Sequence, residues 1–252
     1  MSPGPDVVAP AALRDLAVRA AQFAAAGCLL EFTEGVTVRT KGAEGDLVTS
    51  ADLAAERVVR DVIASARAED SILGEELPPH IGTSGLQWVV DPLDGTTNFT
   101  RRLPFFATSV AVRRGEDEWL AAAVCAPALS STWSAARGHG AELESPSGRE
   151  QLPLTLPSSS ARLLGTGLSY DVGHRRRQVR ELGAALADYT DMRRFGAAAI
   201  DLCLVAQGSL DAFVEDDLAL HDWAAGALIA EEAGAQVQRP RNADPAVTAR
   251  WR

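Results

Sequence analysis

The feature that most constrains this chain is the segment Trp88-Val-Val-Asp-Pro-Leu-Asp-Gly-Thr-Thr-Asn-Phe99. The apolar run Gln87–Val90 predicts a strand, and Pro92 predicts that this strand stops at Asp91, because proline cannot continue a hydrogen-bonded ladder. The residues from Asp94 onward, Asp-Gly-Thr-Thr, then predict a tight turn into the N-terminus of a helix. The chain must therefore place two carboxylates in one bend at the end of a strand.

This bend favours a particular chemistry. Two carboxylates so close together repel each other unless a cation lies between them. Ligands that are all oxygen favour a hard ion, Mg²⁺ or Mn²⁺, over zinc. Backbone N–H groups at the start of the following helix can bind phosphate oxygens. The alternative interpretation is that Asp91 and Asp94 only form local turn hydrogen bonds, and the longer motif and its agreement with distant segments argue against it.

Periodicity and turn signals predict helices and strands that alternate in blocks, which favours layered α and β sheets. Predicted helices cover 11–32, about 55–63, 173–187, 197–206 and 222–232, and Thr49 and Asp52 have capping-box spacing before the second. Predicted strands cover 71–73, 87–90, 105–112, 119–126, 131–136, 141–143, 163–166, 209–215 and 235–238. We expect one domain over 1–252 with two lobes, about 1–150 and 151–252, whose boundary is the Ser- and Pro-rich stretch 145–160, a predicted loop.

Composition narrows the functional classes. Lys and Arg number 24 against 34 Asp and Glu, and the net charge of −10 disfavours nucleic acid and anionic membranes as partners. No apolar run approaches the ~20 residues that span a bilayer, and Met1–Pro10 lacks the basic region of a signal peptide. Cys28, Cys125 and Cys203 form no CxxC pair, which predicts reduced core thiols and a cytoplasmic protein.

The segment Asp91–Phe99 resembles the signature of the inositol monophosphatase family, which belongs to the lithium-inhibited phosphatases. Four further parts of the chain resemble motifs of that family in the same order. They are Lys41–Asp52, Gly74-Glu75-Glu76, Gly196–Cys203 followed by Gly208–Glu215, and Asp222–Gly226 with Glu231–Gly234. Taken alone, each has a simpler interpretation as a helix cap, a solvated loop pair or a charged turn. Their joint occurrence over about residues 40–240 carries the resemblance.

The resemblance implies an α+β layered sandwich of αβαβα type and a lithium-sensitive homodimer. It implies Mg²⁺-dependent hydrolysis, with two or three ions per site and Mn²⁺ as an alternative, of a small phosphorylated polyol. Inositol 1-phosphate is the leading substrate, and histidinol phosphate and fructose 1,6-bisphosphate are alternatives from the same superfamily. An alternative of another class is a metal-binding regulatory protein with little turnover.

The resemblance also implies a role for each matching residue. The first metal would be held by Glu75, Asp91 and the carbonyl of Leu93, and the second by Asp91, Asp94 and Asp222. Glu75 and waters would hold a weaker third ion. Water would be activated by Glu75 and Thr96, and Asp52 would orient Thr96. The substrate-binding set would be Leu93, Asp94, Gly95, Thr96, Gly196, Ala197, Ala198, Glu215 and Asp222, with the amides of Gly95 and Thr96 on the phosphate.

Two departures from the family pattern stand out. His221 occupies a position where the family usually has Trp, and we expect it to reshape that wall of the site. The C-terminal part is short relative to the family, because Arg239–Arg252 shows none of the helix and strand pattern expected after Val237. This second departure concerns the packing of the second lobe and none of the proposed ligands.

Overall fold

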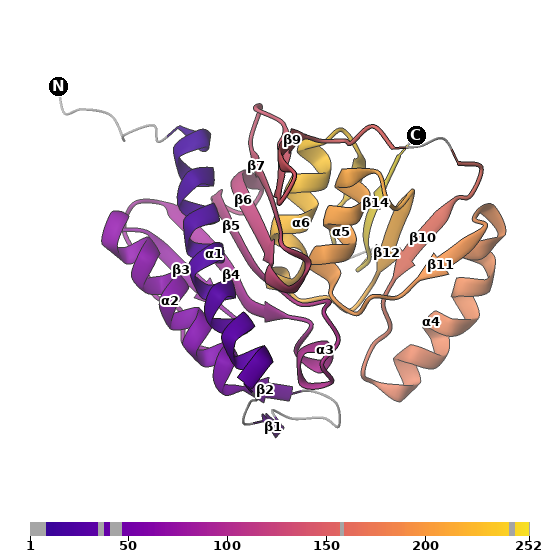
Figure 1. Ribbon diagram of the computed structural model, residues 1–252, viewed down its shortest axis with the longest axis horizontal. Coiled ribbons are helices and arrows are strands. Elements are labelled where there is room, and N and C mark those ends of the chain that lie inside the picture. The colour runs from indigo at the N-terminus through magenta and orange to yellow at the C-terminus, as the bar shows by residue number, and fades with distance from the viewer. Residues whose placement is uncertain (1–8, 35–37, 41–46, 157–158, 242–244, 252) are drawn as a thin grey trace.

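The computed structural model describes residues 9–34, 38–40, 47–156, 159–241 and 245–251 of the chain. Figure 1 shows five layers side by side: two helices, a seven-stranded sheet, two more helices, a five-stranded sheet and a last helix. This arrangement is the predicted αβαβα sandwich. The division into two lobes stays a prediction.

The first layer consists of α1 (Pro10–Glu34) and α2 (Ser50–Ala66), which pack against each other and against the large sheet. In α1, Leu13, Ala17 and Cys28 are buried at helical spacing. By length and composition alone, this helix is long and apolar enough to cross a membrane. The prediction that no apolar run approaches the length of a membrane span is therefore wrong. The packing of its buried face on the sheet accounts for this apolar character.

A short hairpin, β1 (Val38–Thr40) and β2 (Leu47–Thr49), precedes α2. Its strands are too short for the periodicity of the sequence to indicate them. The segment from Lys41 to Asp46, which begins the first acidic motif, lies outside the described residues.

The large sheet has the strand order β3-β4-β5-β6-β7-β8-β9, parallel between the first two strands and antiparallel thereafter. Its strands are β3 (Ser71–Gly74), β4 (Leu86–Asp94), β5 (Ala107–Arg114), β6 (Glu118–Ala126), β7 (Ser131–Ala136), β8 (Ala141–Ser145) and β9 (Gly148–Gln151), with the 3₁₀ turn η1 (Pro127–Leu129) before β7. The predicted loop 145–160 is therefore wrong at β9. This edge strand is exposed at every position and shows no apolar alternation; backbone pairing with β8 holds it.

The prediction that β4 stops at Asp91 is also wrong. The strand continues to Asp94, but its pairing with β5 is interrupted between Asp91 and Asp94. Pro92 lies in this irregular stretch, where no ladder hydrogen bond is required of it. Bulges of this kind re-aim side chains next to active sites, and this one turns the two aspartates out of the strand alternation.

The inner layer is α5 (Ala198–Gln207) and α6 (Leu220–Glu232), which lie between the two sheets (Figure 1). The small sheet has the order β11-β10-β12-β14-β13, and its outer face is covered by α4 (Val172–Ala185), which the 3₁₀ turn η2 (Leu186–Asp188) follows. Its strands are β10 (Leu163–Thr166), β11 (Asp191–Arg193), β12 (Ala212–Glu215), β13 (Gln236–Gln238) and β14 (Val247–Arg250).

The absence of a strand pattern in Arg239–Arg252 was misleading, because β14 lies between β12 and β13 in the small sheet. Val247 and Ala249 are buried, and Trp251 Nε1 donates a 2.8 Å hydrogen bond to the Val205 carbonyl. A strand with two small buried residues gives too weak an alternation to be recognised in the sequence.

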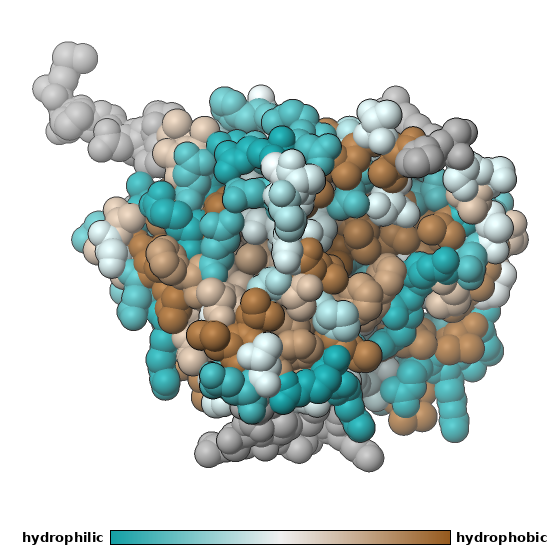
Figure 2. Space-filling view, viewed as in Figure 1, coloured by the Kyte–Doolittle hydropathy of each residue, from teal (hydrophilic) through white to brown (hydrophobic). Residues whose placement is uncertain are grey.

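Two apolar cores cover the two faces of the large sheet, one under α1 and α2 and the other under α5 and α6. Strand alternation separates them: Trp88 and Val90 belong to the first core, and Val89 belongs to the second. The three cysteines are buried and unpaired, as predicted. Figure 2 shows apolar residues across the middle of one face and hydrophilic residues along its upper edge.

Asp70 is a buried acid immediately before β3. Its carboxylate accepts hydrogen bonds from the Arg67 guanidinium and from Trp88 Nε1, the latter at 2.8 Å. Burial by itself raises the pKa of this carboxyl, but hydrogen bonds from Arg67, Ser84 and Trp88 outweigh burial and hold the pKa below its usual value.

We expect Asp70→Asn to lower the free energy of unfolding at neutral pH by about 2 kcal/mol, because hydrogen bonds to a charged group contribute about 1.5–3 kcal/mol. Since the folded-state pKa is lowered, the stabilisation is present above the unfolded-state pKa of about 4 and is lost as the pH falls through the folded-state value. Urea unfolding at pH 7 and at about pH 3 measures it. A difference between variant and wild type that stays constant over this range would contradict the assignment.

Candidate active site

The bend after β4 leads into a short helix, α3 (Thr96–Thr100). Gly95 caps this helix with φ 86°, a left-handed conformation that suits glycine. A Cβ at Gly95 would lie 2.6 Å from the Phe105 carbonyl oxygen, so no larger residue fits there. The predicted turn into a helix is confirmed, and Gly95 is needed for both its conformation and its lack of a side chain.

Acidic side chains from four parts of the chain line one cavity of about 330 Å³ next to this bend. Glu75 follows β3, Asp91 and Asp94 end β4, and Asp222 lies in the first turn of α6. Glu215, at the end of β12, lies on the same cavity wall. The fold therefore brings together the five acids that the sequence analysis grouped, although they are up to 147 positions apart in the chain.

Hydrogen bonds fix the two aspartates of the bend. Asp91 Oδ1 accepts from the Leu93 N–H at 3.0 Å, within the bend itself. Asp94 Oδ2 accepts from the Ala199 N–H at 2.8 Å, which joins the bend to the first turn of α5. The position of Asp94 thus depends on the contact between the large sheet and the inner helices.

The carboxylates lie close enough to oppose each other's ionisation. Burial, together with the charges of Glu75, Asp94 and Asp222, raises the pKa of Asp91 well above its usual value. Burial and the charge of Asp222 raise the pKa of Asp94 to about 8. Divalent cations bound among these oxygens would remove that repulsion, so the donor set fits a hard metal ion.

Thr96 and Asp52 meet as predicted. Thr96 Oγ1 lies 3.2 Å from Asp52 Oδ1 and 3.0 Å from the Leu93 carbonyl oxygen, and its hydroxyl can donate a hydrogen bond to either. Asp52 is fully buried in the first turn of α2. Its carboxylate therefore helps to fix the side chain of Thr96 at the wall of the cavity.

The cavity is also lined by Gly196, Ala197 and Ala198, next to Glu215. Burial, followed by the charges of Asp94 and Asp222, raises the pKa of Glu215 to about 8. A Cβ at Gly167 would lie 1.9 Å from Glu215 Oε1, so a glycine in that neighbouring loop leaves room for the carboxylate. Ala197 precedes α5 and gives it no side-chain cap, and Asp94 Oδ2 accepts from the Ala199 N–H of the first turn instead.

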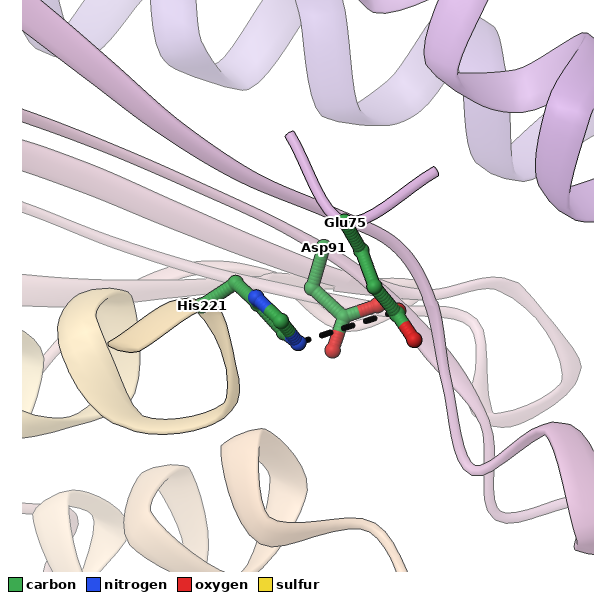
Figure 3. A group of neighbouring side chains, drawn as sticks. All are labelled: Glu75, Asp91 and His221. Atoms are coloured by element: carbon green, nitrogen blue, oxygen red, sulfur yellow. Dashed lines mark ion pairs between the residues drawn. The ribbon is translucent and has the colours of Figure 1, made fainter. Parts of the chain in front are cut away.

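His221 also faces the carboxylates, as Figure 3 shows. One ligand atom each from Glu75, Asp91 and His221 lie within 4.8 Å of one another. His221 Nε2 is 3.9 Å from Glu75 Oε2 and 3.7 Å from Asp222 Oδ1. From the sequence we expected His221 to reshape this wall of the site, but not that it faces the proposed metal ligands.

Glu56 contacts the turn that carries Glu75, and it was not among the site residues predicted from the sequence. Its buried carboxylate accepts hydrogen bonds from the Arg60 side chain at 2.8 Å and from the backbone N–H groups of Glu76 and Leu77. A Cβ at Gly74 would lie 2.0 Å from Glu56 Oε1. Glu56 therefore holds the turn that carries Glu75, and the only signal in the sequence is its i,i+4 spacing to Arg60.

Two further contacts close the cavity walls without having been predicted. Asn98 Nδ2 donates to the carbonyl oxygens of Phe105 at 2.8 Å and Phe195 at 2.7 Å, which ties α3 to the loop before α5. The hydroxyl groups of Tyr170 and Thr97 lie 2.9 Å apart, which joins the loop before α4 to α3. Local patterns do not indicate the contacts to Phe195 and Tyr170, because each joins residues more than 70 positions apart.

Comparisons with known proteins agree with this geometry. A family model described as the inositol monophosphatase family matches residues 10–250. The chain is 42% identical over 217 residues to an inositol-1-monophosphatase of Mycobacterium leprae, covering 84% of this chain and 74% of that protein. It is 39% identical over 207 residues to the Nus factor SuhB of Salmonella typhimurium, covering 81% and 75%. The structure of Mycobacterium tuberculosis SuhB matches with a TM-score of 0.81 and 40% identity, over 96% of this chain and 92% of that one.

Proposed function

The chain belongs to the inositol monophosphatase family, and we propose that it is a Mg²⁺-dependent phosphatase of small phosphate monoesters, with inositol 1-phosphate as its leading substrate. The observation that supports this most directly is the convergence of Glu75, Asp91, Asp94 and Asp222 on one cavity beside the Gly95 bend. The relative named inositol-1-monophosphatase favours the same substrate class.

We propose the same metal ligands that the sequence predicts. Glu75, Asp91 and the Leu93 carbonyl would hold one ion, and Asp91, Asp94 and Asp222 a second, with Mg²⁺ preferred and Mn²⁺ as the alternative. Bound divalent ions supply Lewis-acid activation of water and neutralise charge on the phosphoryl group. Among the described residues lining the cavity, Arg194 is the one cationic side chain, so the phosphate needs these added positive charges.

The remaining residues position the reactants. The amides of Gly95 and Thr96 would bind phosphate oxygens. Glu75 and Thr96 would activate the attacking water, with Thr96 accepting a hydrogen bond from it, Glu75 accepting its proton and Asp52 orienting Thr96. Glu215 and the backbone of Gly196–Ala198 would contact the hydroxyl groups of the alcohol. Because Ala197 and Ala198 carry no side-chain hydroxyl, their contacts to the substrate would come from the backbone.

A second function has one observation in its favour. The 39% identical relative is named a Nus factor, so a metal-binding regulatory protein with little turnover is the alternative. The homodimer, the cytoplasmic location and the lithium sensitivity remain predictions alongside it.

Phosphate release from a substrate panel separates these functions. We expect purified protein with Mg²⁺ to release phosphate from inositol 1-phosphate with a higher kcat/KM than from histidinol phosphate or fructose 1,6-bisphosphate. Chelation with EDTA should abolish the release, and added Mg²⁺ should restore it. No release from any monoester would reject the phosphatase and favour the regulatory protein.

A further inference from the structure

His221 lies beside the proposed metal ligands and belongs to a different element than Glu75 and Asp91. It is in the first turn of α6, next to Asp222, and its side chain is 21% exposed. Figure 3 shows its ring pointing toward Glu75 and Asp91. The imidazole therefore faces two of the proposed ligands.

The distances around His221 Nε2 do not correspond to ordinary hydrogen bonds. The oxygens of Glu75 and Asp222 lie 3.9 and 3.7 Å away, whereas N–H···O bonds measure about 2.7–3.2 Å. Within the part of the chain that the structure describes, no hydrogen bond to the His221 ring is found. The ring thus faces the carboxylates across a gap.

This gap matches the spacing of atoms that share one ion. Donor atoms lie about 2.1 Å from a small divalent metal, so two ligands of one ion are at most about 4.2 Å apart. The 3.9 Å between His221 Nε2 and Glu75 Oε2 falls below that limit, and one ligand atom each from Glu75, Asp91 and His221 lie within 4.8 Å of one another.

We propose that His221 is a nitrogen ligand of the ion held by Glu75 and Asp91, and that it makes this position prefer Mn²⁺ over Mg²⁺. The inference rests on the proposed function, whose metal site it refines. Mg²⁺ binds almost entirely through oxygen, whereas a neutral imidazole suits first-row transition ions. A mixed set of two carboxylates and one imidazole therefore shifts the preference toward the transition ion.

Mn²⁺ binding to the full-length wild-type chain tests this without measuring activity. Pulsed EPR of the Mn²⁺ complex should show modulation from a directly bound ¹⁴N nucleus. His221→Phe should remove that modulation and weaken Mn²⁺ binding at least about tenfold, because even outer partners of metal ligands contribute 10–100-fold. Its Mg²⁺ affinity, measured by competition, should change less than about threefold, since Mg²⁺ gains little from the ring.

His139→Phe is the matched control, because His139 lies in the exposed turn between β7 and β8 and is not part of the group formed by Glu75, Asp91 and His221. It should keep both the modulation and the Mn²⁺ affinity. Wild-type Mn²⁺ binding without ¹⁴N modulation would overturn the inference while leaving the proposed phosphatase intact. Failure of the wild type to bind either ion would overturn the metal site of the proposed function and this inference with it. The wild-type spectrum decides the point even if the His221 variant does not fold.

Discussion

Asp94→Asn is expected to reduce phosphate release by at least about a hundredfold while leaving the fold intact. The variant removes the charge of a proposed metal ligand, and even outer partners of metal ligands contribute 10–100-fold to metal affinity or activity. Its side-chain oxygen can still accept the hydrogen bond from the Ala199 N–H. Because burial and Asp222 already disfavour the charged form of Asp94 in the metal-free protein, the neutral amide should not lower metal-free stability.

Steady-state phosphate release at saturating Mg²⁺ and thermal unfolding measure the two parts of this prediction. Asp117→Asn makes the same chemical change in the exposed turn between β5 and β6 and should keep full activity. If Asp94→Asn retains more than about a tenth of the wild-type rate, the proposed two-metal arrangement is wrong.

Glu56→Ala is expected to lower the free energy of unfolding by about 3–5 kcal/mol, the range for removing one partner of a buried ion pair. The change removes the carboxylate partner of the Arg60 guanidinium, which keeps the Leu77 carbonyl oxygen as an acceptor. It also removes the acceptor that the backbone N–H groups of Glu76 and Leu77 share. Since that turn positions Glu75, we also expect weaker metal binding in the protein that remains folded.

Urea unfolding gives the stability change, and titration with Mn²⁺ below the unfolding transition gives the metal affinity. Asp61→Ala, an exposed acid on the same helix, serves as the control and should change stability by less than about 0.5 kcal/mol. A loss of stability equal to that of the control would show that Glu56 does not hold the turn. Unchanged Mn²⁺ affinity in a destabilised variant would show that the turn does not position Glu75 for metal.

Much of the site could be predicted from local sequence. The strand that leads to Asp91, the turn at Gly95 and the helix start at Asp222 each follow from residue types at a fixed spacing. The two aspartates of the bend already indicate a cation, because charges so close in sequence cannot be far apart in space. The resemblance to the inositol monophosphatase family extended this from one bend to the full set of acids.

The elements that prediction missed share a physical cause. Strands β9 and β14 depend on backbone pairing with a neighbouring strand, which any sequence can form, so little in their own residues indicates them. The extension of β4 through Pro92 depends on a local break in the pairing with β5. Periodicity reports which face of an element is buried and carries no information about the partner that covers it.

The sequence by itself determined the chemistry available at the site: oxygen-rich ligands, a glycine at the bend and a hydroxyl beside it. Only the tertiary structure decided which side chains share that site, since Glu56 under the Glu75 turn and His221 opposite Glu75 are contacts between distant segments. The physical reason is that the charge and donor atoms of a side chain are properties of one residue. The distance between two such residues is set by the packing of every layer that lies between them.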